Sequence, residues 1–306
     1  MILVVLGAGA SFDSVPRFCG REIDEHGRLD CRPPLADQLF QDRPDFVKIL
    51  SAYPDVLKIV PYLRPNGQDD WTVESALARL ASEASTDAAR RAQLIDARLF
   101  IQRAIRECTH AWHLRAAGES SYATLFDEVQ RHAHAGEEVV AVTFNYDTLL
   151  EWALGWNLHP NWTLDLYLRQ PVKVFKLHGS LNWVRVLPLM AGKDPVRQMK
   201  ERAAALLSSS EFQFSLDFNC QWRGQVALPA LALPVAGKTD FECPASHLVE
   251  LSTLLPKVRR AILVGWRGQE QHFLDLLSNN VQRGVETLVV DRDAASAAAI
   301  SSALRN

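Results

Sequence analysis

The chain opens with the stretch ILVVLGAGAS, residues 2–11, and this stretch decides the fold. Its first half, Ile2 to Leu6, holds only branched aliphatic residues, a pattern typical of a parallel strand that is buried on both faces. Gly7 and Gly9 follow, and glycines at this spacing allow a tight turn and a close approach of the backbone to a phosphate. The stretch therefore predicts a buried strand that turns into a helix.

Similar aliphatic runs predict the other strands of one parallel sheet. They are Val139 to Val142, Val172 to Leu177, Ala261 to Val264 and Thr287 to Val290. Apolar residues at three- and four-residue spacing predict helices from Val73 to Leu80, Ala88 to His113 and Tyr122 to His134. We expect an α/β fold, a Rossmann-like parallel sheet flanked by helices.

The spacing of these runs predicts a single domain over residues 1–306 that carries two insertions. A large helical insertion at 35–135 separates the first and second core strands. A second insertion at 185–225 contains a helix-like stretch from Pro195 to Ser208, followed by a mixed aromatic segment.

Composition narrows the class of protein. Hydrophobic residues are 48% and charged residues 23% of the chain, which is typical of a folded globular protein. The net charge of −3 gives no direct nucleic-acid signal. Five scattered cysteines without a C-x-x-C pair argue against a disulfide framework and a zinc knuckle, so we expect a cytoplasmic protein without a metal. The apolar run at the N-terminus is too short for a signal peptide or a membrane span.

Polar residues follow the predicted strands, at the sheet end where open α/β sheets bind ligands. Thr143, Phe144, Asn145 and Asp147 come after the second run. Asn145 and Asp147 fit two interpretations, an N-cap pair for the next helix or contacts to a ligand. His178 follows the third run, beside a glycine, and a lone histidine at such a place is either structural or functional.

Taken together, these segments resemble the sirtuin family and its bacterial NAD-hydrolysing relatives. The matching motifs occur in the family's order: G-A-G-x-S with a following proline, T-x-N-x-D, and L-H-G-S. Ile262 to Trp266, followed by Glu270, is similar to the I-G-Y-S-x-x-D type of strand end in the bacterial branch, and a last strand that ends in Asp291 follows. The resemblance implies that NAD is the substrate and that Asn145 and His178 are the catalytic pair. It also implies NAD contacts from Gly7, Ala8, Gly9, Ala10, Ser11, Pro16, Thr143, Phe144, Asp147, Gly179, Gly265, Trp266 and Asp291.

Within that set the resemblance assigns parts of the dinucleotide. The glycine turn is expected to hold the pyrophosphate, and Asp147 to orient Asn145 or bind the nicotinamide side. Gly265, Trp266 and Asp291 are expected to line the adenosine half.

Departures from the family pattern refine the expected activity. The two C-x-x-C pairs of the deacylating members are missing, which favours action on NAD itself over protein deacylation. Phe12 replaces the third glycine of G-x-G-x-x-G, which argues against a dehydrogenase.

We therefore expect an NAD glycohydrolase that releases nicotinamide and ADP-ribose, and by resemblance a defence effector that depletes NAD. A homo-oligomer or an activating partner protein is expected as well. The alternatives are a non-catalytic NAD or ADP-ribose sensor that regulates a partner, and an ADP-ribosyltransferase.

Overall fold

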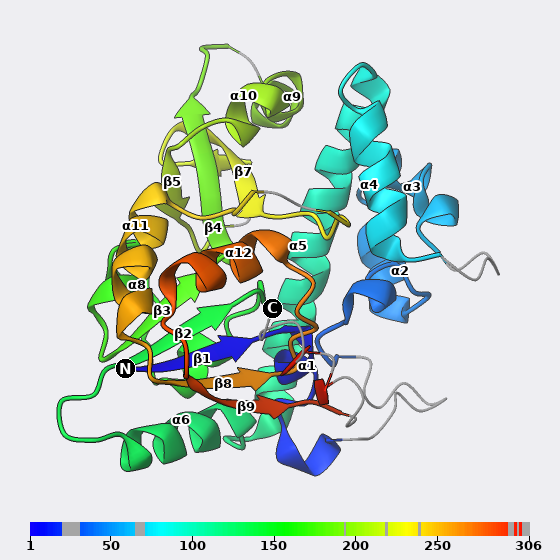
Figure 1. Ribbon diagram of the computed structural model, residues 1–306. Coiled ribbons are helices and arrows are strands. Elements are labelled where there is room, and N and C mark those ends of the chain that lie inside the picture. Colours follow the sequence, from blue (N-terminus) through cyan, green and yellow to red (C-terminus); the bar gives the residue numbers. More distant parts are fainter. Residues whose placement is uncertain are drawn as a thin grey trace.

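The computed structural model describes residues 1–19, 31–64, 71–192, 194–217, 220–237 and 240–292, with residues 297–298 and 300–301. Its main sheet has the strand order β3-β2-β1-β8-β9, and every neighbouring pair is parallel (Figure 1). The strands are β1 (Ile2–Leu6), β2 (Val139–Thr143), β3 (Val172–Lys176), β8 (Arg260–Val264) and β9 (Glu286–Val290). The predicted Rossmann-like fold class is confirmed.

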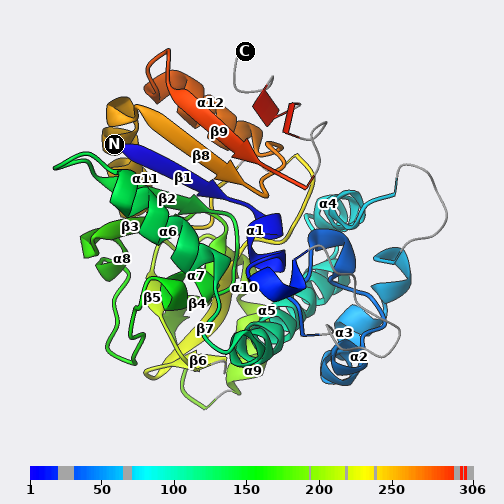
Figure 2. The same cartoon turned by 90° about the horizontal axis from the view of Figure 1, so that it is seen from below.

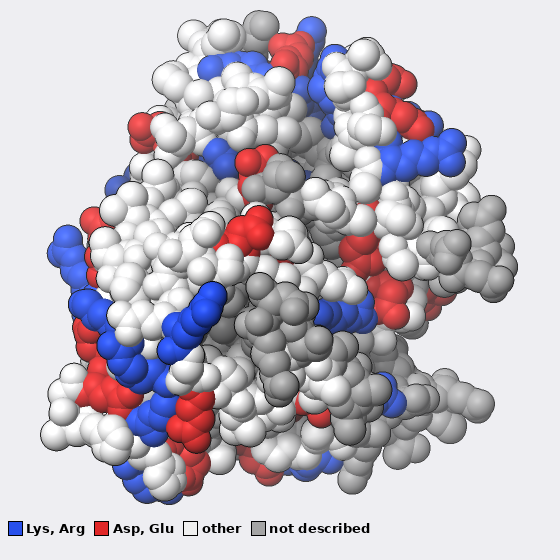
Figure 3. Space-filling model, viewed as in Figure 1, with Lys and Arg blue, Asp and Glu red and all other residues white. Residues whose placement is uncertain are grey.

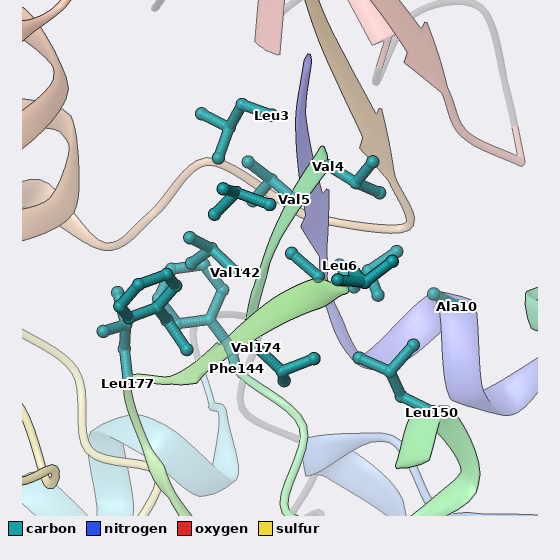
Figure 4. Packing of buried hydrophobic residues seen from close by; sticks show 14 of the residues in the cluster. Leu3, Val4, Val5, Leu6, Ala10, Val142, Phe144, Leu150, Val174 and Leu177 are labelled. Carbon is teal, nitrogen blue, oxygen red and sulfur yellow. The ribbon is translucent and has the colours of Figure 1, made fainter. Parts of the chain in front are cut away.

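The two central strands form because all their side chains find apolar neighbours. Every residue of β1 and β2 is buried, so both faces of the sheet are covered at its centre. Figure 4 shows Leu3, Val5 and Val142 within one continuous cluster that also takes in Leu150 of the helix after β2. Full burial of one such aliphatic side chain contributes about 1.5–3 kcal/mol, so this cluster supplies much of the driving force for folding.

Helices cover both faces of the sheet. On one face lie α11 (Ala245–Leu254) and α12 (Gln271–Asn280), and on the other α6 (Ser121–His132) and α7 (Leu149–Ala153) (Figures 1 and 2). The connections therefore change face between β1 and β8. This is the topological switch point, beyond whose carboxyl edge open α/β sheets bind ligands.

Most of the described residues between β1 and β2 are helical. They form α2 (Pro44–Leu50), α3 (Pro54–Leu57), α4 (Val73–Glu83), α5 (Ala88–Ala116) and α6. The long helix α5 begins at an N-cap, Asp87, whose carboxylate accepts hydrogen bonds from the backbone of Ala89 and Arg90. Among α2 to α6, the helices predicted from Val73, Ala88 and Tyr122 are present.

Short turns complete the helical elements. They are α1 (Ala8–Phe12), η1 (Pro16–Phe18), η2 (Ala36–Gln38), η3 (Val60–Tyr62), α8 (Leu166–Arg169) and η4 (Leu255–Lys257). Within the described residues, no helix combines the length and the apolar character that crossing a membrane requires.

A second, antiparallel sheet was not foreseen from the sequence. Its order is β5-β4-β7-β6, formed by β4 (Gly179–Pro188), β5 (Phe212–Phe214), β6 (Gln221–Trp222) and β7 (Gln225–Leu231). The helix-like stretch expected from Pro195 to Ser208 is divided into α9 (Pro195–Glu201) and α10 (Ala203–Leu207). The single-domain description and the insertion boundaries at 35–135 and 185–225 stay predictions.

The turn after β1 is packed directly on the end of β8. A Cβ atom at Gly7 would lie 2.3 Å from the carbonyl oxygen of Gly265, and one at Gly9 would lie 3.0 Å from the Gly265 Cα. The Gly9 amide also donates to the Gly265 carbonyl at 3.2 Å. Gly7 is therefore required by backbone-to-backbone contact at the switch point, and a side chain at Gly9 would be crowded there, independently of any ligand.

We expect Gly7→Ala to lower the free energy of unfolding by about 1–3 kcal/mol or more, because the added methyl group overlaps backbone that cannot move aside easily. Chemical denaturation measures the change. Ala8→Ser is the control, since Ala8 lies exposed in the same turn and should unfold like the wild type. Equal stability of the Gly7 variant and the wild type would show that the contact between Gly7 and the Gly265 backbone does not require glycine.

Candidate functional site

Three strand ends meet at the carboxyl edge of the parallel sheet. The Phe144 amide donates to the Leu6 carbonyl at 3.1 Å, and the Leu177 amide donates to the Thr143 carbonyl at 3.0 Å. These bonds continue the sheet register beyond the strands. The glycine turn, the T-x-N-x-D loop and the L-H-G-S segment are therefore neighbours, as the order of parallel strands predicts.

Asn145 is bonded to the glycine turn through its side chain. Its Nδ2 lies 2.8 Å from the Gly7 carbonyl, 2.9 Å from Ser11 Oγ and 3.1 Å from the Tyr122 hydroxyl, and the residue is 7% exposed. A backbone carbonyl can only accept, so the Gly7 oxygen requires the NH₂ end of the carboxamide to face it. The Oδ1 atom consequently lies on the other side of the group.

Tyr122, at the start of α6, completes this cluster and was missed by the sequence analysis. Its hydroxyl lies 2.7 Å from Ser11 Oγ, and burial raises the pKa of Tyr122 above its ordinary value. In the sequence it was assigned only to an apolar-periodic helix. No sequence signal distinguishes it from an ordinary core tyrosine, because its partners come from α1 and from the loop after β2.

The helix-cap interpretation of the T-x-N-x-D loop holds for Asp147 and not for Asn145, and contact of either residue with a ligand stays a prediction. Asp147 Oδ1 accepts from the Leu149 amide at 3.1 Å, so Asp147 caps the first turn of α7. The Asn145 side chain does not cap this helix but turns to α1. Thr143 supports the loop, because its hydroxyl accepts from the Asn145 amide at 3.1 Å.

His178 lies half-buried among aromatic rings. The centroid of its imidazole is 4.9 Å from that of Phe144, 6.5 Å from that of Tyr146 and 6.4 Å from that of His272 on α12. The Asn145 contacts run to α1 and α6, whereas the His178 contacts include α12 on the opposite face of the sheet. The predicted catalytic residues thus occupy neighbouring strand ends but lean to different faces.

The predicted NAD contacts of the glycine turn differ in exposure. Ala8 and Pro16 are exposed and Gly9 is half-exposed, whereas Ala10 and Ser11 are buried. The turn is therefore open to solvent at Ala8 and partly open at Gly9.

Gly179 carries a different constraint. Its φ is +81°, and a Cβ atom would lie 2.0 Å from the Ala230 carbonyl of β7. The glycine is needed where β4 begins, whether or not a ligand is bound.

The predicted adenosine contacts also differ in exposure. Trp266 is 2% exposed, stacks on Phe144 with ring centroids 5.7 Å apart, and donates from Nε1 to Glu270 at 2.6 Å. Its indole therefore belongs to the core in this structure. Gly265 and Asp291 are half-buried at the ends of β8 and β9.

A buried ion pair lies beneath the site and was also missed. Lys176 Nζ is 3.0 Å from Glu151 Oε1, with side-chain exposures of 1% and 0%. Lys176 also donates to the Asp147 carbonyl, and the Tyr167 hydroxyl donates to Glu151 at 3.1 Å. The cluster ties the end of β3 to the T-x-N-x-D loop and to α7.

We expect Lys176→Met to lower the free energy of unfolding by about 3–5 kcal/mol, because it leaves the Glu151 carboxylate buried without its cation. The double variant Lys176→Met/Glu151→Leu should recover part of the loss. Arg103→Met is the control, since Arg103 pairs with Glu107 on the exposed surface of α5 and should have little effect. Urea unfolding gives the free energy of unfolding of all four proteins. If Lys176→Met is as stable as the wild type, the ion pair between Lys176 and Glu151 does not contribute as proposed.

His247 shows the structural role that a lone histidine often has. It is fully buried against Trp183, Tyr167 and Phe175, and its Nε2 lies 3.2 Å from the Leu164 carbonyl. Burial lowers the pKa of His247 from 6.5 to about 4. The folded protein therefore keeps this ring neutral at pH values where the unfolded chain protonates it.

We expect this histidine to make stability depend on pH. Because its folded pKa is below the unfolded one, its contribution is complete above about pH 6.5 and is lost as the pH falls toward about 4. Between pH 7 and pH 5 the loss is about 2 kcal/mol. Urea unfolding of wild type and His247→Phe across this range measures it, and parallel pH curves would refute the assignment.

The described residues contain no group of three or more His, Cys, Asp or Glu side chains placed to hold a metal ion. On the face shown in Figure 3, acidic and basic side chains are intermixed, most densely at the lower left.

Comparison with known proteins gave no family model and no curated protein that matches. Among solved structures, a Sir2 homologue in complex with NAD aligns with TM-score 0.40 and 14% identity, over 99% of this chain and 88% of that one. Sir2Tm bound to a propionylated peptide aligns with TM-score 0.39 and 13% identity, over 96% and 81%. A mutant Sir2 homologue in complex with 2′-O-acetyl-ADP-ribose aligns with TM-score 0.41 and 13% identity, over 100% and 94%.

Proposed function

We propose that the carboxyl edge of the parallel sheet binds NAD and that this chain hydrolyses the nicotinamide–ribose bond, releasing nicotinamide and ADP-ribose. The observation that carries the proposal is the Asn145 carboxamide, bonded to the glycine turn at the switch point, with His178 at the next strand end. Polar groups from several strand ends at this position are typical of a dinucleotide site.

Cleavage of the nicotinamide–ribose bond needs little acid catalysis from the protein. Nicotinamide leaves neutral from a pyridinium, so no proton is needed on the leaving group. The ribose left behind resembles an oxocarbenium ion. The site must therefore hold the ribose, keep bulk water away and direct one water at C1′.

Asn145 is suited to direct that water. Its NH₂ group is engaged by Gly7, Ser11 and Tyr122, so Oδ1 is the atom that remains to serve a ligand. A carbonyl oxygen accepts a hydrogen bond from water or from a ribose hydroxyl without changing charge. In this proposal Asn145 orients the nucleophile and does not take its proton.

His178 supplies the second polar group. It is half-exposed within a wall of rings from Phe144, Tyr146 and His272, which limits access of water. An imidazole donates or accepts according to its tautomer, so it can orient a ribose hydroxyl or take its proton.

Asn145 and His178 lean toward opposite faces of the parallel sheet, and NAD is long enough to extend from one to the other. The pyrophosphate is proposed to lie beside the exposed Ala8 and the half-exposed Gly9, and the adenosine half near Gly265 and Asp291. The nicotinamide ribose would then cross the sheet end between Asn145 and His178. Asp147 acts through the loop that it caps.

Asn145→Ala and His178→Ala are each expected to reduce NAD turnover by about 100-fold or more while leaving folded protein, as for groups that act in the transition state. Chromatography of nicotinamide and ADP-ribose measures the rate, and calorimetry measures NAD binding. Asn280→Ala and His132→Ala are matched controls, because these residues lie on the far parts of α12 and α6. Full turnover in either site variant would remove that residue from the mechanism.

The same assay separates the alternative functions. Binding of NAD or ADP-ribose without release of product indicates a sensor. Transfer of label from NAD to protein or nucleic acid indicates an ADP-ribosyltransferase. The proposal includes a homo-oligomer or an activating partner, and a role in defence by depletion of NAD. The assay is therefore run over a range of protein concentrations, with the oligomeric state measured in parallel.

A further inference from the structure

We infer that Tyr122 is a positioning residue that holds the Asn145 carboxamide in the orientation used by the proposed reaction. The inference rests on the proposed function. Tyr122 belongs to α6, far from the strand ends in the sequence, and its hydroxyl bonds to both Ser11 Oγ and Asn145 Nδ2.

Counting hydrogen bonds shows what the hydroxyl contributes. The Asn145 NH₂ group has two protons, and three acceptor oxygens lie within 3.1 Å of Nδ2. The Gly7 carbonyl takes one proton, so the other is shared between the Ser11 and Tyr122 oxygens. Without the phenol oxygen, Ser11 alone would hold the second proton, and the carboxamide would rotate more freely.

The phenol oxygen is held in place because the start of α6 is hydrogen-bonded to the two residues that follow α1. The Ser121 amide donates to the Ser14 carbonyl at 2.7 Å, and its hydroxyl donates to the Asp13 carbonyl at 3.2 Å. Trp112 of α5 donates from Nε1 to Ser14 Oγ at 2.9 Å. Tyr122 itself is 3% exposed, so solvent does not compete for its hydroxyl.

Tyr122→Phe tests this role because it removes one oxygen and keeps the ring. We expect kcat for NAD hydrolysis to fall about three- to tenfold, the effect of one hydrogen bond, with KM for NAD nearly unchanged. Thr109→Val is the control: it removes another buried hydroxyl, bonded to the Ile105 carbonyl at 2.6 Å on α5, and should leave both constants unchanged. Equal kcat in wild type and Tyr122→Phe overturns the inference.

A double variant shows whether Tyr122 acts through Asn145. In the Asn145→Ala background, Tyr122→Phe should cause no further loss of turnover, because the group that it positions is absent. A further loss as large as in the wild-type background overturns the inference.

A readout without turnover keeps this inference separable from the proposed function. In protein labelled with ¹⁵N-asparagine, the Asn145 side-chain NH₂ signals, assigned by their loss in Asn145→Ala, should exchange slowly with solvent. Tyr122→Phe should speed that exchange, and Thr109→Val should not. If wild type does not hydrolyse NAD, the proposed function fails, and faster exchange still supports the Tyr122–Asn145 contact. Unchanged exchange in Tyr122→Phe overturns it.

Discussion

The contact between the glycine turn and the end of β8 is the constraint on which the rest of the molecule depends. Gly7 and Gly9 meet Gly265 backbone to backbone, so the two halves of the sheet close together at the switch point. That closeness sets where α1 begins and places the Gly7 carbonyl against Asn145. The packing of three glycines therefore supplies one of the contacts that orient the proposed catalytic carboxamide, beside those from Ser11 and Tyr122.

The parallel sheet was predictable because its strands carry their burial in consecutive residues. Runs such as Ile2 to Leu6 have no polar face, and only a strand covered on both sides accommodates them. The second sheet lacks that signal. β7 contains Pro229, and its partner β4 is separated from it by α9 and α10, so the pairing is nonlocal and irregular near Gly179. Local patterning could not identify partners so far apart.

The site was predictable in location but not in detail. Parallel strands bring their carboxyl ends to one edge, so Asn145 and His178 were expected near the glycine turn. Which way each side chain leans depends on the helix packed beside it, α6 for Asn145 and α12 for His178. Lys176 is the clearest limit, because a lysine before a strand end is normally solvated and only the tertiary fold reveals Glu151 beside it.

The backbone contact between the glycine turn and Gly265 means that a glycine-rich turn is not by itself a sign of ligand binding. Since a side chain at Gly7 would overlap the backbone of Gly265, and one at Gly9 would crowd it, selection for a stable fold alone would favour glycine at both positions. A protein of this fold that binds no dinucleotide would still favour the G-A-G turn. If function diverged within this architecture, polar side chains such as that of Asn145 would be replaced first. The glycines of the turn would be replaced last.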